Sequence, residues 1–250
     1  MPVKKQSIQI TDLTAKAFIE KLNTYQSDEE LHKIQRYFKT EAGAYGAGDE
    51  FIGVRMGQVF ELAKTFIEMP INEIEKLLES LVHEVRAGAV SIMDFQARNK
   101  KIPENRKKEL FDLYINRHDR INNWDLVDRS APYVVGGYLF DKPRDILYDL
   151  AVSENIWERR TAIVSTYFFI RQGQLDDTFR IAEILLNDTE DLIHKAVGGW
   201  LRATGTKGRQ RLRAFLDQYA AIMPRTMLRY AIEHFDQAER TYYLGMSKKD

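Results

Sequence analysis

The sequence predicts an all-α fold in which antiparallel helix pairs stack as a solenoid. Apolar residues recur at helical spacing, three to four residues apart, almost throughout the 250-residue chain. Strand-like alternation is nearly absent, and breaks rich in Gly and Pro separate segments of mostly 10 to 18 residues. Helices of this length joined by short turns pack as antiparallel neighbours.

The expected helices follow one another between these breaks. The first includes residues 13–22, a later one includes residues 59–67, and two more begin near Asn123 and Asn155. The breaks fall at residues 43–48, Pro70, residues 100–104, Pro132, Pro143, Gly173, residues 205–208 and Pro224. No Ser/Pro-rich linker interrupts this series, so we expect one domain over residues 11–245 with short tails at 1–10 and 246–250.

A weak internal repeat favours a solenoid over a closed bundle. A basic residue precedes small or apolar ones at Arg86, Arg160 and Lys195, at spacings of 74 and 35 residues. The first spacing is close to two repeats of about 37 residues, just below the length of HEAT and armadillo repeats. We therefore expect a C-shaped, HEAT-like solenoid whose basic and polar positions line one concave surface.

Composition narrows the function classes. Hydrophobic residues make up 44% and charged residues 30% of the chain, and no apolar run approaches the roughly 20 residues of a membrane helix. With no cysteine and no apolar leader, we expect a cytoplasmic protein that does not associate with a membrane. We also expect a monomer. The five histidines lack metal-ligand spacing, and no phosphate-binding loop is present, so we expect neither metal nor cofactor.

Charge is balanced overall but unevenly distributed. Residues 1–94 carry 11 Lys and Arg against 15 Asp and Glu, and the remainder carries 26 against 22. Residues 195–213 contain six basic residues and no acidic one. They are Lys195, Arg202, Lys207, Arg209, Arg211 and Arg213. Such a density suits phosphate binding, and a solvated helix face is the alternative.

The residues best suited to chemistry lie near Asn123. On a helix, Trp124 and Asp128 are one turn apart and share a face, and Arg160 falls on the same inner surface one repeat later. Taken singly, such a Trp usually packs against a neighbour, such an Asp is usually solvated, and such an Arg usually forms a surface ion pair. The functional hypothesis rests on their joint placement.

Residues 123–128, Asn-Trp-Asp-Leu-Val-Asp, resemble the signature of the AlkD-type DNA alkylation repair glycosylases. Further agreement in order and spacing occurs at Pro132, Gly136, Tyr138-Leu139, Arg36-Tyr37, residues 53–55, residues 156–160, residues 195–198 and Leu201-Arg202. The resemblance runs from about residue 30 to about residue 215. It implies a stack of HEAT-like helix pairs that grips duplex DNA and excises cationic N-alkylated purines such as 3-methyladenine and 7-methylguanine.

The resemblance also implies roles for single residues. Trp124 corresponds to a tryptophan that packs against the lesion nucleotide, Asp128 to the catalytic aspartate, and Arg160 to an arginine that contacts a phosphate. Tyr37 corresponds to a tyrosine that contacts DNA. The remaining expected DNA contacts are Arg55, Lys195, Arg202, Lys207 and Arg209.

One position departs from the family pattern. The family commonly has a second groove-lining tryptophan after the glycine that corresponds to Gly198, whereas this chain has Gly199 there and Trp200 one place later. One residue turns a helical side chain by about 100°, so Trp200 is not expected on the same wall. Losing a stacking contact of roughly 1 to 3 kcal/mol lowers activity or alters substrate range. A non-catalytic DNA-binding relative and a HEAT-type protein scaffold therefore stay open as alternatives.

Overall fold

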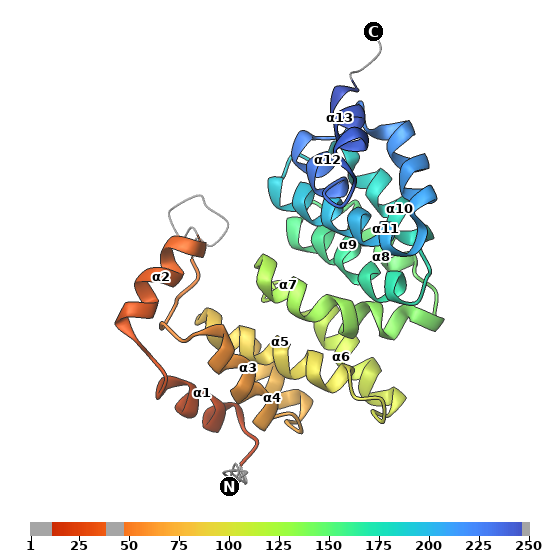
Figure 1. The fold of residues 1–250 in the computed structure, drawn as a ribbon. Coiled ribbons are helices and arrows are strands. Elements are labelled where there is room, and N and C mark those ends of the chain that lie inside the picture. Colours follow the sequence, from red (N-terminus) through yellow and green to blue (C-terminus); the bar gives the residue numbers. More distant parts are fainter. Residues whose placement is uncertain (1–11, 39–47, 247–250) are drawn as a thin grey trace, which may run out of the picture. The chain divides into compact units, whose positions relative to one another are not determined.

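A computed structural model describes residues 12–38 and 48–246, and of Tyr37 the backbone alone. Within these residues the regular elements are helices, apart from an isolated parallel β-bridge between Glu50 and Val82 (Figure 1). The all-α prediction is confirmed. No helix in the described part of the chain combines the length and apolar character needed to cross a membrane.

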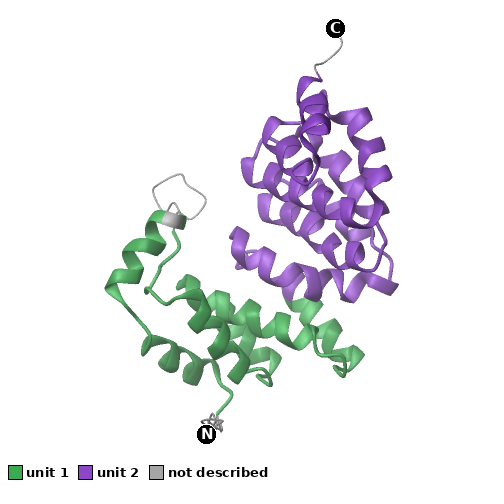
Figure 2. Ribbon diagram, viewed as in Figure 1, with its two compact units in different colours: residues 1–113 green, residues 114–250 purple. Residues whose placement is uncertain are grey.

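The chain divides into two compact units, residues 1–113 and 114–250 (Figure 2). A single repeat domain over residues 11–245 and the C shape of its stack stay predictions. The expected tails at 1–10 and 246–250 lie outside the described residues, apart from Met246.

Helix α5 is the centre of the first unit. It packs against α3 and α4, and almost all of its residues are buried. Small and apolar residues at 87–90 and 92–93 agree with burial on every side. Several polar side chains of α5 are also buried, and they include Glu84 and Arg86, which form hydrogen bonds with neighbouring segments. The helices of this part of the chain are α1 (Ala15–Asn23), α2 (Asp28–Phe38), α3 (Met56–Thr65), α4 (Ile71–Leu78), α5 (His83–Ala97) and α6 (Glu104–Asn116), whose end enters the second unit.

Helix α9 has the same central place in the second unit, where it packs against α7, α8, α10 and α11. Helix α11 is interrupted at Gly208, whose backbone is not helical, so the break expected over residues 205–208 is confined to that residue. The α-helices are α7 (Trp124–Ala131), α8 (Asp145–Ala151), α9 (Ile156–Arg171), α10 (Asp176–Ile184), α11 (Asp191–Tyr219), α12 (Arg225–Ala231) and α13 (Gln237–Gly245). Shorter helical segments are η1 (Pro132–Gly136), η2 (Tyr138–Asp141) and η3 (Leu185–Asn187).

A repeated hydrogen bond defines the register of the central helices. Arg86, Arg159 and His194 are each the fourth residue of their helix, and each donates a side-chain N–H to the carbonyl six residues earlier, at 2.8, 2.9 and 2.6 Å. Arg86 is thus equivalent to Arg159, not to Arg160 as the sequence repeat suggested. The error arose because two adjacent arginines, 159 and 160, satisfy the same sequence pattern.

The same register relates three candidate site residues. Asp128, Arg160 and Lys195 are each the fifth residue of their helix, in α7, α9 and α11 respectively. The expected equivalence of Arg160 and Lys195 therefore agrees with the register of the structure.

Two glycines allow backbones to approach closely in the second unit. A Cβ at Gly136 would overlap the carbonyl oxygen of Ser165, so η1 lies directly against α9. A Cβ at Gly198 would overlap the carbonyl oxygen of Met227, so α11 lies directly against α12. Gly199, the next residue, has no atom within 4 Å of such a Cβ.

Adjacent alanine substitutions in α11 are expected to have opposite effects on stability. Gly198→Ala should lower the free energy of unfolding by about 1 to 3 kcal/mol, because the added methyl forces two backbones apart. Gly199→Ala should leave it unchanged or raise it by up to about 1 kcal/mol, because Ala favours the helix and the methyl enters open space. Urea unfolding followed by circular dichroism measures both, and equal effects would contradict the packing described.

Candidate catalytic site in the second unit

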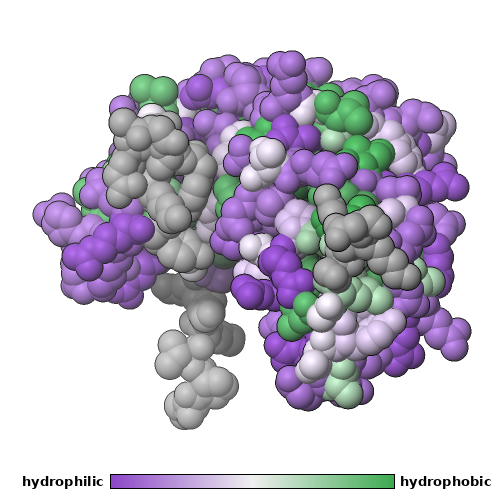
Figure 3. Space-filling view, turned by 90° about the horizontal axis from the view of Figure 1, so that it is seen from above, coloured by the Kyte–Doolittle hydropathy of each residue, from purple (hydrophilic) through white to green (hydrophobic). Residues whose placement is uncertain are grey.

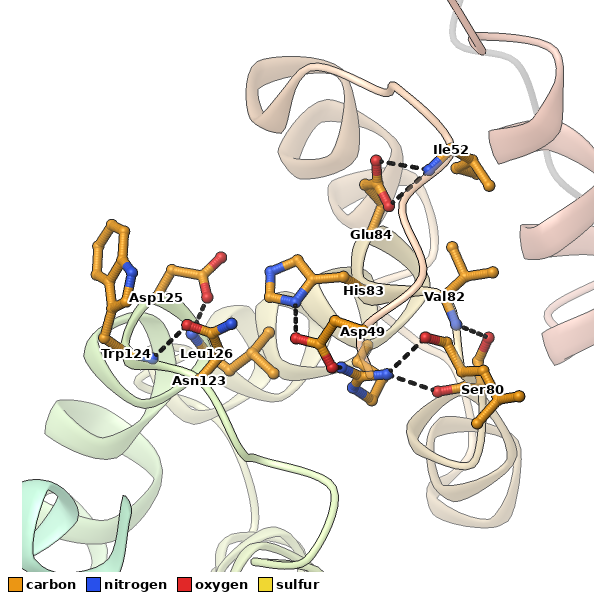
Figure 4. Close-up of polar contacts among 12 residues, drawn as sticks. Asp49, Ile52, Ser80, Val82, His83, Glu84, Asn123, Trp124, Asp125 and Leu126 are labelled. Carbon is orange, nitrogen blue, oxygen red and sulfur yellow. Dashed lines mark hydrogen bonds and ion pairs between the residues drawn. The ribbon is translucent and has the colours of Figure 1, made fainter. Parts of the chain in front are cut away.

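The start of α7 is set by a buried asparagine. The Asn123 side-chain oxygen accepts a hydrogen bond from the Trp124 backbone N–H at 2.8 Å, which satisfies one donor at the helix start (Figure 4). Because α7 begins at Trp124, Asp128 lies one helical turn further on and on the same side. The indole of Trp124 is half-buried and points away from the axis of α7 (Figure 4).

The end of α7 is shaped by a proline four residues after Asp128. Pro132 has no N–H to donate to the Asp128 carbonyl, so the regular α-helical bond at this place cannot form. The chain continues as the π-helical segment η1, where the Gly137 N–H donates to the Pro132 carbonyl at 3.0 Å. Segments of this kind occur frequently at functional sites.

Asp128 forms a two-point ion pair with Arg160. Arg160 Nε donates to one carboxylate oxygen at 2.9 Å and Nη2 donates to the other at 2.7 Å. Arg160 Nη1 donates to the Leu192 carbonyl oxygen at 2.5 Å, which anchors the guanidinium to α11. The Arg160 side chain is 7% exposed and the Asp128 side chain 32%, so the carboxylate is the accessible member of the pair.

Opposing effects act on the Asp128 carboxyl. Burial among the surrounding side chains raises its pKa above the usual range, the Arg160 guanidinium lowers it, and the nearby charge of Asp125 adds a smaller raising effect. The net direction is a raised pKa. Arg160 thus favours the ionised form of the Asp128 carboxyl against the effect of burial.

The basic run in α11 is largely compensated by acidic partners. Arg202 pairs with Glu233, and Lys195 pairs with Asp191 at 2.7 Å. Arg209 and Arg213 both pair with Glu239, at 2.8 and 2.7 Å. Surface pairs of this kind contribute little and are screened by salt, so phosphates can exchange with the carboxylates.

Lys207 has no ion-pair partner among the residues that the structure describes and is exposed. The face of the molecule in Figure 3 is mostly hydrophilic, with small groups of hydrophobic residues.

Acidic partners elsewhere in the chain explain how this basic run of α11 occurs in a protein whose formal net charge is zero.

Trp200 is turned toward α9. Its indole N–H donates to the Val164 carbonyl at 2.9 Å, and its ring centroid lies 5.3 Å from that of Tyr167. These contacts hold the indole in its own place, while the position of Gly199 carries no side chain and is open. Trp200 therefore does not fill the open space at Gly199, the position at which the family pattern has a tryptophan.

Two of the expected DNA contacts, Arg55 and Tyr37, belong to the first unit. Arg55 is 65% exposed and pairs with Glu30 at 2.8 Å. Hydrogen bonds from Arg55 and Lys33 lower the pKa of the Glu30 carboxyl to about 2. Glu84 holds the loop before Arg55, because its carboxylate accepts the N–H groups of residues 52–54. Figure 4 shows the contact with Ile52. The side chain of Tyr37 lies outside the described residues, so its expected DNA contact stays a prediction.

Sequence reasoning missed a buried polar group beside the ion pair, formed by Tyr114, His118 and Thr161. Sequence alone carried no signal for it, because single polar residues between apolar ones are ordinary on solvated helices. In the described ranges, no three His, Asp or Glu side chains come together as a metal site.

Removing the guanidinium should change the titration of Asp128. In Arg160→Gln the pKa of the Asp128 carboxyl should rise further, because burial still raises it and the lowering charge is lost. Carboxyl ¹³C NMR titration measures this. Arg159→Gln is the matched control, since Arg159 pairs with Asp188 at 2.6 Å. An unchanged Asp128 titration in Arg160→Gln would contradict the assigned pair.

Comparisons with known proteins bear on the fold and the family of the chain. The solved structure named "Predicted DNA alkylation repair enzyme from Enterococcus faecalis" is similar in fold, with a TM-score of 0.69 at 16% sequence identity. The similarity covers 85% of this chain and 97% of that one. No curated protein matches the sequence. The profile of the DNA alkylation repair enzyme family matches residues 18–235, and the chain therefore belongs to that family.

Proposed function

We propose that this protein is a DNA glycosylase that hydrolyses the N-glycosidic bond of cationic N-alkylated purines in duplex DNA. Substrates of the 3-methyladenine and 7-methylguanine type are expected. The observation that supports this most is the Asp128 carboxylate, held at two points by Arg160 and 32% exposed. Membership of a DNA alkylation repair family supports the repair role.

The substrate itself explains why one carboxylate is enough. An N-alkylated purine carries a positive charge, so breaking its bond to C1′ leaves the electron pair on the base and releases a neutral molecule. Such a leaving group needs no general acid. The charge passes to the sugar, which becomes oxocarbenium-like in the transition state.

Asp128 acts on that sugar cation. An ionised carboxylate stabilises positive charge developing at C1′ and accepts a hydrogen bond from the water that adds there. The water oxygen forms the new bond to C1′, and its proton passes to solvent or transiently to Asp128. The products are a free base and an abasic site.

Trp124 selects for charge. The face of an indole attracts a cation with about 0.5 to 2 kcal/mol, which a neutral purine gains to a smaller degree. Being half-buried and one turn from Asp128, Trp124 presents both an apolar surface and proximity to the carboxylate. Undamaged bases are thereby disfavoured.

Arg160 has a double role in this proposal. Three of the five N–H groups of a guanidinium are used by Asp128 and the Leu192 carbonyl. Its first role is to hold the carboxylate in place and ionised. Contact with a DNA phosphate stays a prediction for the two remaining N–H groups.

DNA binding is assigned to cations that exchange their carboxylate partners for phosphates. Lys195, Arg202 and Arg209 are paired in this way, and Lys207 is exposed. Arg55 in the first unit also has an exchangeable partner. Exchange of counterions and ion pairs makes affinity fall as salt rises.

A non-catalytic DNA-binding relative is the second candidate. The open position at Gly199 favours it, because a wall without an aromatic side chain provides less contact for a nucleotide. A HEAT-type scaffold that binds proteins is the third candidate. The cytoplasmic location and the monomeric state stay predictions for all three candidate functions.

Base release from methylated duplex DNA tests the proposed function. The wild type should release 3-methyladenine or 7-methylguanine, detected by chromatography, and Asp128→Asn should lower the single-turnover rate by about 100-fold to 1,000-fold. Asp125→Asn is the matched control, because Asp125 lies on the same helix, and one of its carboxylate oxygens accepts the Leu126 N–H at 2.9 Å. The charge of Asp125 raises the pKa of Asp128, so its removal favours the ionised Asp128 carboxylate and should not lower the rate.

The other outcomes of this assay distinguish the alternative functions. DNA binding without base release by the wild type would support the non-catalytic relative. Absence of both would support the scaffold. Equal rates for the wild type and Asp128→Asn would remove Asp128 from the chemistry even if bases are released.

A further inference from the structure

A buried hydrogen-bond network lies next to the Asp128–Arg160 pair. The Thr161 hydroxyl oxygen is 2.9 Å from the Tyr114 hydroxyl and 3.0 Å from His118 Nε2. Thr161 and Tyr114 are fully buried, and His118 is 5% exposed. The Tyr114 hydroxyl also forms a hydrogen bond with Ser130. One threonine hydroxyl thus joins two side chains where water is excluded.

The network connects the two helices that carry the ion pair. Thr161 follows Arg160 in α9, and Ser130 lies two residues after Asp128 in α7. Tyr114 and His118 come from the end of α6 and the turn that follows it. Successive residues on a helix point about 100° apart, so Thr161 contacts the network while Arg160 reaches Asp128.

We propose that Tyr114, Thr161 and His118 are positioning residues that set α9 against α7 and so keep Arg160 in two-point contact with Asp128. The inference rests on the proposed function for its effect on catalysis. A two-point contact needs the guanidinium and carboxylate planes aligned, and a small rotation of α9 converts it into a single bond. Thr161 is the key residue, because its hydroxyl meets both partners.

The donor and acceptor roles in this network follow one order along the chain of side chains. The Ser130 hydroxyl donates to the Leu126 carbonyl at 2.7 Å, so Ser130 accepts from Tyr114, which leaves Tyr114 to accept from Thr161. Thr161 then accepts from His118 Nε2–H. Each hydroxyl donates once and accepts once, and a neutral histidine with its proton on Nε2 completes the chain.

Two acidic residues lie close to the His118 ring. Glu158 on α9 has a carboxylate oxygen 3.9 Å from Nδ1, and Asp119 adjoins it in the chain. Both raise the pKa of His118, whereas burial, the larger effect, lowers it below the usual range. The neutral ring therefore persists through neutral pH, and the network keeps its direction there.

Three variants of α9 test the proposal. Thr161→Val keeps the shape and removes the hydroxyl, and Thr161→Ser restores a hydroxyl. Thr166→Val is the matched control, since Thr166 is also fully buried in α9 and bonds the Ile163 carbonyl of its own helix at 2.7 Å. Base release from methylated duplex DNA is measured across pH for each variant. The Asp128 carboxyl is titrated by ¹³C NMR without DNA.

Thr161→Val should lower the single-turnover rate by about 10-fold to 100-fold, because small misplacements of reacting groups have effects of this order. It should also move the acid limb of the rate profile to higher pH, because a displaced Arg160 lowers the pKa of Asp128 less. Thr161→Ser should restore both, and Thr166→Val should leave both unchanged.

The proposal would be overturned if Thr161→Val kept the single-turnover rate and the acid limb of the wild type. It would also be overturned if Thr161→Val and Thr166→Val changed these two quantities equally. If the wild type releases no base, the proposed function fails by itself. The NMR titration still decides on positioning. A higher Asp128 pKa in Thr161→Val than in Thr166→Val supports it, and equal values overturn it.

Discussion

The two-point bond between Arg160 and Asp128 is the interaction on which the candidate site depends. A carboxyl surrounded by protein tends to take up a proton, and the neutral acid cannot stabilise a sugar cation. The guanidinium opposes this tendency from a buried position, and the Leu192 carbonyl holds it from the third helix. Helices α7, α9 and α11 thus all contribute to the placement of one carboxylate.

Local features of the chain converge on this bond. Asn123 sets where α7 begins, and Pro132 ends its regular hydrogen bonding four residues after Asp128. Gly136 then lets η1 lie against the backbone of α9. Asp128 and Arg160 are each the fifth residue of two helices that pack against each other, α7 and α9, which explains how side chains 32 residues apart in sequence meet. The packing of the two helices supplies the proximity, and the residue types supply the charge.

Much of this arrangement was predictable from sequence. Helical periodicity indicated the all-α fold. A helix start near Asn123, with Trp124 and Asp128 one turn apart, indicated the start and one face of α7. Spacing could not reveal that Arg160 bonds Asp128 itself, because the rotation of α9 depends on tertiary packing. The repeat was misaligned at Arg86, because adjacent arginines are equivalent in a pattern but not on a helix.

Ion pairing was the other feature that sequence could not supply. A run of basic residues without an acid looks uncompensated, yet its partners lie elsewhere in the chain, as Glu233 and Glu239 do. Under the proposed function, this pairing lowers the long-range attraction of the run for DNA and makes binding an exchange of ion-pair partners. A protein organised in this way recognises a phosphate backbone at short range more than it attracts one from a distance.

The central claim is that an ionised Asp128 faces positive charge on the sugar of a bound nucleotide. Duplex DNA with a cationic pyrrolidine in place of one deoxyribose mimics that charge, and a tetrahydrofuran analogue is its neutral counterpart. The account predicts that the wild type binds the cationic duplex at least about 10-fold more tightly than the neutral one. It predicts that Asp128→Asn abolishes the preference. Equal affinity of the wild type for both duplexes, or a preference that persists in Asp128→Asn, would contradict it.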